Sequence, residues 1–308
     1  MTYLKKFVVP ILVFLVVVSN ASSSAANGGE SQVPSQLVGF SQAIPPFATA
    51  KDGDITRGVN YASGSAGIRD ESGNKLGTHV SLNKQLENHR NIISRLANIM
   101  GNQTDCLLNK CLYTVGMGSN DYINNYFLPQ SPARTLFSPD QYAAELIDQY
   151  SQQIKSLHDA GARKMALFGL GLIGCTPFEM ASSGNNGSCA DNINSAAQLF
   201  NGRLVSLVDE LNKELADAKV TYINMTGITT GGDPSRIGIK VVNAGCCPIN
   251  NVGQCVPNSI PCPNRNEYAF FDGFHPTEIV NKVSAARCYK ADSPSDAYPF
   301  DISHLVQG

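Results

Sequence analysis

Strand-like and helix-like patterns alternate along most of the chain, and this alternation constrains the fold more than any other feature. Buried-type apolar runs indicate strands at 111–121, 164–170 and 219–225, and a shorter strand running into a glycine-rich turn at 57–67. Amphipathic spacing predicts helices at 80–101, 138–161, 189–215 and 275–289. Such an order predicts an α/β fold, a three-layer α/β/α sandwich around a mainly parallel sheet. There is neither a repeat nor a low-complexity linker, so we expect one domain over residues 27–308.

Helix boundaries are also encoded locally. Ser138 and Pro139 suit the cap and first position of a helix that closes at Gly161. Gly101 stops the helix before it, and Pro276 opens the last one.

The first 26 residues have the pattern of a secretory signal peptide. Two lysines precede the apolar run Phe7–Val18, and small residues with Ser24 and Ala26 follow it. The run is short for a membrane span, although an uncleaved anchor is the alternative reading. No later run is long enough to cross a bilayer. We therefore expect a secreted, extracellular protein with no stable membrane span after signal cleavage.

Nine cysteines fit that compartment, because secretion permits disulfides. Cys246, Cys247, Cys255 and Cys262 crowd a stretch rich in proline, asparagine and glycine, which cross-links would order. A zinc site is the alternative, disfavoured because no histidine lies in the cluster. Cys175 and Cys189 flank another polar loop and are a further candidate pair, while the odd count leaves at least one thiol unpaired or intermolecular.

The sequons agree with the expected secretion, and the charge bears on the possible partners. Asn102, Asn186 and Asn224 each begin an N-x-S/T sequon, which predicts a glycoprotein; the Asn20 sequon falls within the expected signal peptide. The net charge of −2 and pI of about 6.2 provide no basic stripe, so no nucleic-acid partner is expected.

Asp272 and His275 form a D-x-x-H pattern just before the last expected helix. A carboxylate that accepts the Nδ1 proton of an imidazole fixes its tautomer and makes Nε2 a general base. The pattern alone is weak, because a buried histidine held by a nearby aspartate is commoner than a catalytic pair. The other histidines, expected to be solvated or satisfied in the core, are His79, His89, His158 and His304.

Two glycine-containing turns supply candidate oxyanion donors. Asn120 follows a strand in "GMGSND", and its side-chain amide could donate to a developing oxyanion. Gly64 in "NYASGSAG" could donate through its backbone N–H. Taken separately, each motif is more commonly explained by ordinary turn chemistry.

Taken in order, these blocks carry a family resemblance. "GVNYASGSAGI", "GMGSNDYINNY", "GARKMALFGLGLIGCTP", "NAGCC" and "FFDGFHPTE" follow one another, and similarity continues to "SPSDAYPFDI". The chain resembles the plant GDSL esterase/lipase family of the SGNH hydrolase superfamily from about Val38 onward. The resemblance implies a flavodoxin-like sandwich and hydrolysis of carboxylic esters, with small acyl or acetyl esters or lipids as substrates and no cofactor or metal. It also implies that Asp272 and His275 are acid and base, and that Gly64 and Asn120 are oxyanion donors.

One block of the family pattern is missing. The F-G-D-S-L segment with the nucleophilic serine should follow the signal peptide, yet no Gly-Asp-Ser tripeptide occurs in the chain. The flanking resemblance joins near Pro34–Gln36, which indicates an internal truncation that also removes the end of the first strand. Substitute nucleophiles would have to come from nearby serines: Ser35, Ser41, Ser63, Ser65 and Ser119.

The sequence therefore predicts a serine-type esterase/lipase family member with impaired catalysis, no identified nucleophile and a sheet lacking its first strand. A non-catalytic protein that binds esters or glycans, or a non-productive splice variant, is the alternative.

Overall fold

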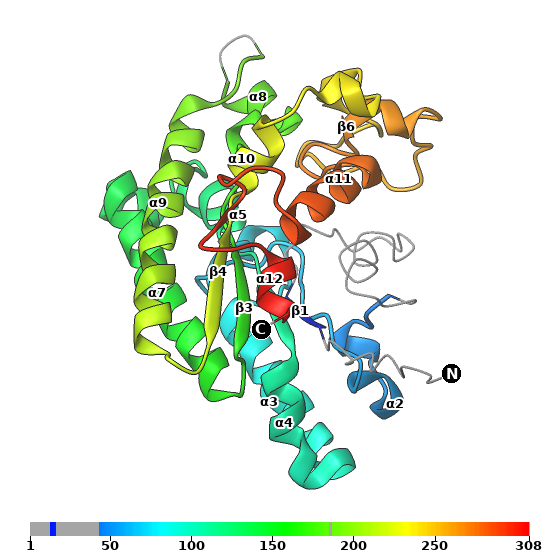
Figure 1. The fold of residues 1–308 in the computed structure, drawn as a ribbon. Coiled ribbons are helices and arrows are strands. Elements are labelled where there is room, and N and C mark those ends of the chain that lie inside the picture. Colours follow the sequence, from blue (N-terminus) through cyan, green and yellow to red (C-terminus); the bar gives the residue numbers. More distant parts are fainter. Residues whose placement is uncertain (1–12, 17–42, 185–186, 308) are drawn as a thin grey trace.

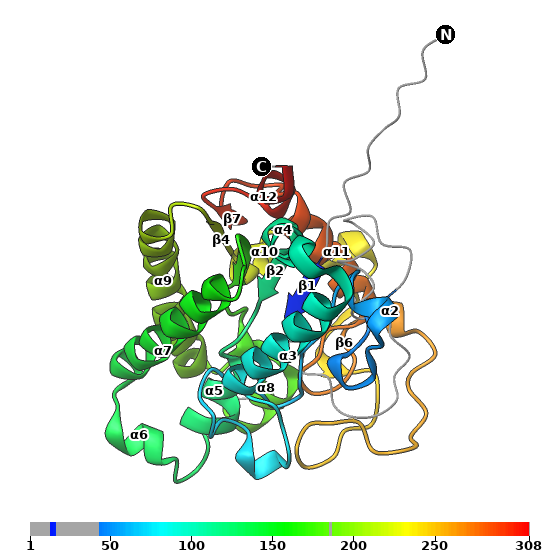
Figure 2. The ribbon, with the colours of Figure 1, turned by 90° about the horizontal axis from the view of Figure 1, so that it is seen from below.

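A five-stranded, mainly parallel sheet forms the centre of the computed structural model, which describes residues 13–16, 43–184 and 187–307. Its strands run in the order β1 (Val13–Val16), β2 (Leu112–Val115), β3 (Lys164–Phe168), β4 (Lys219–Ile223), β7 (Ala297–Tyr298). Only β7 is antiparallel, against β4. Helices cover both faces, so the predicted three-layer sandwich is confirmed (Figures 1 and 2).

Side chains alternate between the two faces of each central strand, as the pleat requires. On β3, for example, Met165 and Leu167 join a large cluster, whereas Ala166 joins a smaller one on the opposite face. The large cluster is formed with α3 (Leu82–Met100), α7 (Pro139–Asp159) and α9 (Asp191–Glu214). The smaller one is formed with α10 (Met225–Thr230), α11 (Glu278–Tyr289) and α12 (Ile302–Gln307).

The four long predicted helices are present as α3, α7, α9 and α11, with boundaries close to those expected except at the start of α11. Pro276 was expected to open α11, but it makes an isolated bridge with Phe270, and the helix begins at Glu278 after Thr277 as its cap. Ser138 caps α7 in a reciprocal capping box with Gln141, followed by Pro139 in its first turn. Gly101 ends α3 as predicted. Short helices complete the chain: α2 (Asp52–Ile55), α4 (Thr104–Lys110), α5 (Ser119–Asp121), α6 (Pro132–Leu136), α8 (Pro177–Ser182).

The edge position beside β2 is occupied by β1. We expected this strand to be lost, but Val13–Val16 pair in parallel with Leu112–Val115 along the whole of β2. These four residues belong to the apolar run that predicts a signal peptide. The same segment therefore lies in the predicted signal peptide and also forms the strand beside β2.

One further local expectation needs correction. The segment 57–67 forms no sheet strand; Asn60 makes only an isolated bridge to Pro46. The apolar content of this segment resembled that of a core strand, but periodicity alone does not identify a partner strand.

The chain before Asp272 forms β6 (Tyr268–Phe270), which pairs with β5 (Val241–Gly245) in a separate two-stranded sheet.

Disulfides order the cysteine-rich stretches. Cys175 bonds Cys189, Cys246 bonds Cys262 and Cys247 bonds Cys255. Sulfurs joined in this way are not available as thiolate ligands, so the zinc alternative is not supported. Cys106, Cys111 and Cys288 are free thiols.

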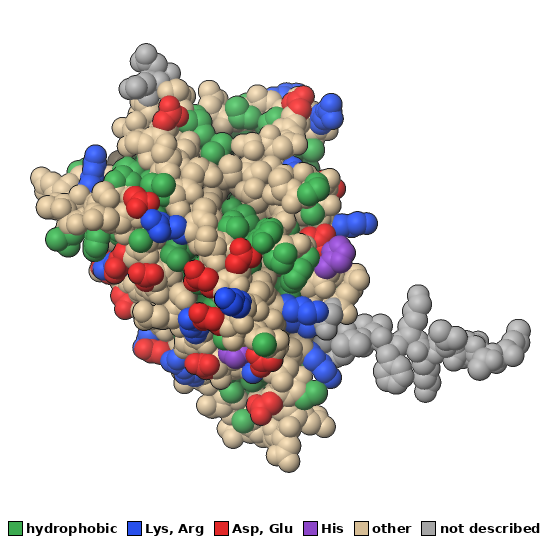
Figure 3. Space-filling view, turned by 60° about the vertical axis from the view of Figure 1, so that its left-hand side comes forward, with side chains coloured by type: hydrophobic (Ala, Val, Ile, Leu, Met, Phe, Trp, Pro, Cys, Tyr) green, Lys and Arg blue, Asp and Glu red, His purple; other side chains and the backbone are tan. Residues whose placement is uncertain are grey.

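Charged side chains of both signs lie interspersed on the face over α7 and α9 (Figure 3). Lys155 pairs with Glu214 and Arg203 pairs with Asp140 across these two helices. Within residues 13–16, 43–184 and 187–307, no helix is long and apolar enough to span a membrane.

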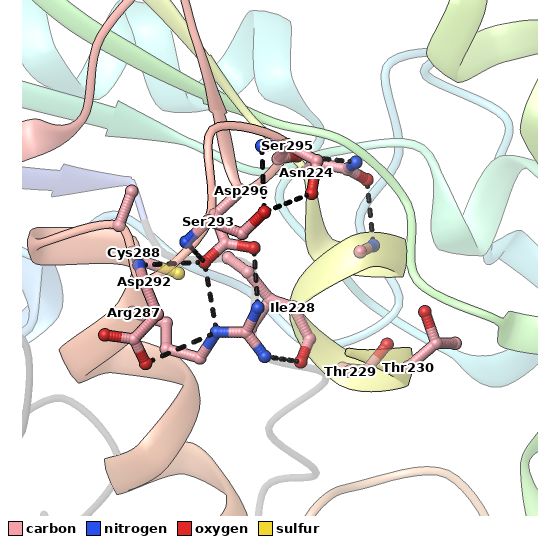
Figure 4. Close-up of polar contacts among 12 residues, drawn as sticks. Asn224, Ile228, Thr229, Thr230, Arg287, Cys288, Asp292, Ser293, Ser295 and Asp296 are labelled. Atoms are coloured by element: carbon pink, nitrogen blue, oxygen red, sulfur yellow. Dashed lines mark hydrogen bonds and ion pairs between the residues drawn. The ribbon is translucent and has the colours of Figure 1, made fainter. Parts of the chain in front are cut away.

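A buried ion pair fixes the C-terminal segment against the helix that follows His275. Arg287 on α11 donates to both carboxylate oxygens of fully buried Asp296, at 2.6 and 3.1 Å, and to the Ile228 carbonyl at 2.8 Å (Figure 4). The backbone N–H groups of Asp292 and Ser293 also donate to Asp296. This network connects α10, α11 and the chain leading into β7.

Replacing Arg287 should be costly because Asp296 would remain as an uncompensated buried charge. We expect Arg287→Ala to lower the free energy of unfolding by about 3–5 kcal/mol, measured by urea titration. Arg203→Ala, which breaks an exposed pair, should change it by less than about 1 kcal/mol. Equal effects of the two substitutions would show that the network does not anchor α11.

Removal of residues 1–26 should expose one edge of β2. In a chain that begins at Asn27, we expect the β2 amides to lose hydrogen-exchange protection relative to the chain that begins at Met1, while β3 and β4 stay protected. Unchanged protection of β2 would mean that β1 does not contribute to the sheet.

Candidate active site

Asp272 and His275 converge within one tight chain reversal after β6. The Phe271 N–H donates to the His275 carbonyl at 2.7 Å, and the Thr277 N–H donates to the Ala269 carbonyl at 2.9 Å. The Asp272 Oδ2 then lies 2.6 Å from the Nδ1 of His275. Its other oxygen accepts the backbone N–H groups of Phe274 and His275, both at 2.8 Å. The predicted pair therefore has the geometry of an orienting carboxylate and a base.

Three donors keep the Asp272 carboxylate ionised. Burial raises the pKa of Asp272, but the His275 side chain and the two backbone N–H groups outweigh burial, so the pKa lies below its ordinary value. An ionised carboxylate can only accept a hydrogen bond, so the proton between the two side chains is on Nδ1. In neutral His275, the lone pair is consequently on Nε2.

Nε2 of His275 is buried and, in the part of the chain that the structure describes, has no hydrogen-bond partner. A buried polar atom without a partner costs free energy, and a catalytic role is one physical reason for a fold to retain such an atom. This is the atom that would accept a proton in acyl transfer.

The loop carrying the pair is held by two neighbouring segments. The Gly273 N–H donates to the Gly253 carbonyl at 2.8 Å, and the Gly273 carbonyl accepts the N–H of Phe178 at 3.0 Å. Phe178 and Phe274 pack with ring centroids 4.9 Å apart. Gly253 has a φ of +77°, and an added Cβ would lie 2.5 Å from the Phe274 ring, so the close approach requires glycine.

The two candidate oxyanion residues lie in adjoining turns. Gly64 is in a turn closed by the Ala66 N–H and the Ser63 carbonyl at 3.3 Å. Asn120, buried at the start of α5, donates through Nδ2 to the Ala66 carbonyl at 2.8 Å and accepts from Asn124 at 2.6 Å. The structure thus joins the Gly64 turn to Asn120, and separately joins Asp272 to His275.

Asp121 is a site residue that the sequence reasoning missed. Its buried carboxylate accepts the N–H groups of Ile68 and Arg69 at 2.9 and 3.0 Å, and the Ser72 hydroxyl at 2.6 Å. It therefore ties the chain after Gly64 to the residue next to Asn120. The sequence feature that could have identified Asp121 is its position in "GMGSND". An aspartate is common in such a turn, so the motif gave no reason to expect a partner far along the chain.

The candidate nucleophiles gain no support from their contacts. The Ser63 hydroxyl accepts the Val80 N–H at 3.0 Å, and Ser65 adopts a left-handed φ of +63° within the Gly64 turn. Ser119 begins α5. Ser35, Ser41 and the join at Pro34–Gln36 lie outside the described residues. No serine hydroxyl within the described ranges contacts Nε2 of His275.

A second D-x-x-H pair shows the purely structural use of the same motif. His304 places Nδ1 2.7 Å from Asp301, whose carboxylate also accepts the His304 N–H and the Ser303 hydroxyl at the start of α12. The His304 side chain is 70 % exposed, against 11 % for His275. His89 is buried beside the Tyr61 hydroxyl at 3.0 Å, and burial lowers its pKa to about 4.

A three-layer α/β fold with a buried, aspartate-oriented histidine is compatible with a hydrolase, and comparison with known proteins gives the family. The profile of the GDSL-like lipase/acylhydrolase family matches residues 22–288. GDSL esterase/lipase At5g45670 of Arabidopsis thaliana is 48 % identical over 283 residues, covering 89 % of this chain and 78 % of the relative. GDSL esterase/lipase At4g18970 of the same plant is 46 % identical over 284 residues, covering 89 % and 79 %. The chain belongs to the GDSL-like lipase/acylhydrolase family.

The Asp121 contacts predict a distinctive pH dependence. Burial raises the pKa of Asp121 to about 6, despite its three donors. A carboxyl whose pKa is higher in the folded state stabilises the fold below its unfolded pKa, and that contribution is lost as pH rises through about 6. Between about pH 4 and pH 7, the unfolding free energy of the wild type should fall by roughly 2 kcal/mol relative to Asp121→Asn. Urea titrations of both proteins across this range would test it; a constant difference would contradict the prediction.

Proposed function

We propose that this chain is a secreted GDSL-type esterase/lipase family member in which Asp272, His275, Asn120 and Gly64 are the retained catalytic machinery. The family assignment supports hydrolase chemistry on small-molecule esters. The observation that carries the role of His275 is its buried Nε2, which has no partner among the described residues. Three disulfides support an oxidising compartment.

In an ester hydrolase of this type, each residue has a separate task. Nε2 of His275 takes the proton of the attacking hydroxyl and later returns it to the leaving group. Asp272 holds the tautomer and stabilises the imidazolium. The Asn120 amide and the Gly64 N–H are positioned, by our proposal, to bind the oxygen that becomes negative in the tetrahedral intermediate.

The missing part is the attacking oxygen. We infer from the absent Gly-Asp-Ser block that the internal segment near Pro34–Gln36 has been lost. The proposal therefore includes little or no turnover by this chain, although a site with base and oxyanion donors could still bind an ester.

Restoring the block tests both parts of this proposal. The chain as given should hydrolyse p-nitrophenyl butyrate at a rate close to the buffer rate and should not react with a serine-directed fluorophosphonate. Inserting the segment that At5g45670 carries at the position matching Pro34–Gln36 should raise kcat/KM by at least about 1000-fold. In that restored chain, His275→Ala should abolish the gain.

His304→Ala in the restored chain is the matched control, because it removes the histidine of the other D-x-x-H pair. It should leave kcat/KM unchanged. Turnover by the unmodified chain that His275→Ala abolishes would overturn the loss of function, and a restored chain insensitive to His275→Ala would overturn the assigned base.

A further inference from the structure

Exposed aliphatic side chains are concentrated next to the Asp272–His275 loop. Ten large hydrophobic side chains are exposed in the described ranges, and half of them lie between Val242 and Ile260. Ile260 is 88 % exposed, the most of the ten. The members of this group are Val242, Ile249, Val252, Val256 and Ile260.

These side chains are displayed on a cross-linked frame, which we call the disulfide-bound segment (residues 241–264; Figure 1, beside β6). The disulfides Cys246–Cys262 and Cys247–Cys255 close it at two points. The Val256 N–H donates to the Pro248 carbonyl at 2.8 Å, and the Asn250 N–H donates to the Gln254 carbonyl at 2.7 Å. Since the frame is fixed, little conformational entropy is lost when the aliphatic groups enter another phase.

The segment carries no charge. Residues 241–264 contain no aspartate, glutamate, lysine, arginine or histidine; Lys240, which precedes the segment, pairs with Glu267, and Arg265 follows it directly. The segment also lacks aromatic residues. Anionic membranes attract basic clusters, and protein interfaces are enriched in aromatic residues and arginine. Neither kind of partner suits this composition, whereas an uncharged lipid surface does.

The segment contacts the loop that carries the base. The Gly253 carbonyl accepts the Gly273 N–H, and the Cys247 N–H donates to the Phe271 carbonyl at 3.0 Å. Gly253 also packs against Phe274, next to His275. A surface that bound the segment would therefore lie beside Asp272 and His275.

We propose that the disulfide-bound segment docks the protein onto the surface of an uncharged lipid aggregate, with Val252, Val256 and Ile260 entering the apolar phase. This proposal rests on the proposed function, because docking at a lipid surface would bring the site close to ester substrates. It does not require turnover, because docking uses side chains outside the base and oxyanion residues.

Flotation with triolein droplets free of charged lipid tests the proposal with the full chain. The wild type should float with the droplets, and Val256→Asp and Ile260→Asp should each weaken binding by roughly tenfold, as expected when one buried aliphatic group is lost. Both positions are exposed, so the variants should fold; near-ultraviolet circular dichroism checks this.

Leu136→Asp is the matched control. Leu136 is 71 % exposed but lies on α6, outside the segment, so this variant should bind as the wild type does. Failure of the wild type to float, or an equal loss of droplet binding in the Leu136 variant, would overturn the proposal.

Other lipid or protein partners are also tested. Stronger binding to phosphatidylglycerol vesicles than to triolein would overturn the proposal. Self-association that Ile260→Asp abolishes, without droplet binding, would assign the surface to a second copy of the chain. Because the readout is binding, failure here is distinct from failure of the ester-hydrolysis proposal.

Discussion

The backbone ladder of the parallel sheet is the constraint on which the rest of the structure depends. All four residues of β2 are buried, so its N–H and C=O groups need strand partners on both sides. β3 supplies one side and β1 supplies the other. At that edge the described strand is β1, whose residues belong to the apolar run that by sequence predicts a signal peptide. A short apolar run fits either a leader or a strand of a parallel sheet, because both favour continuous aliphatic residues.

At the opposite edge, the sheet is closed by the chain end. β7 pairs with β4, and the Thr221 hydroxyl donates to the Tyr298 carbonyl at 3.0 Å. The Arg287–Asp296 ion pair connects this edge strand to α11, which begins three residues after His275. His275 is therefore positioned from two directions: by the local turn at Asp272, and by a helix whose far end is anchored to the C-terminal segment. Loss of either partner of this pair would leave the other as an uncompensated buried charge, so both are needed to hold the far end of α11.

Features that depend on contacts between residues close together in the chain could be predicted from the sequence. The capping box at Ser138, the stop at Gly101 and the Asp272–His275 turn involve residues three or four positions apart, so their patterns were readable. The separate β5–β6 sheet and the role of Asp121 were not, because each depends on partners far along the chain: Asp121 accepts from residues 49 to 53 positions away. The disulfide pairing was likewise open, since the same cysteines allow several connectivities.

Comparison of the two D-x-x-H pairs shows why the motif alone did not decide the function. Asp272 and Asp301 make nearly the same contacts: each accepts the N–H of the histidine three residues later and its Nδ1. What differs is the other ring nitrogen and its surroundings. His304 extends into water, where a lone pair is solvated in any case, whereas His275 presents Nε2 inside the protein without a partner among the described residues. Holding that unsatisfied atom costs stability, and the Asp272 turn, the packing of Phe178 on Phe274 and the cross-linked segment at Gly253 together provide the rigidity that maintains it. The two pairs therefore differ at the second ring nitrogen of the histidine, and not at the aspartate contact, which both copies of the motif share.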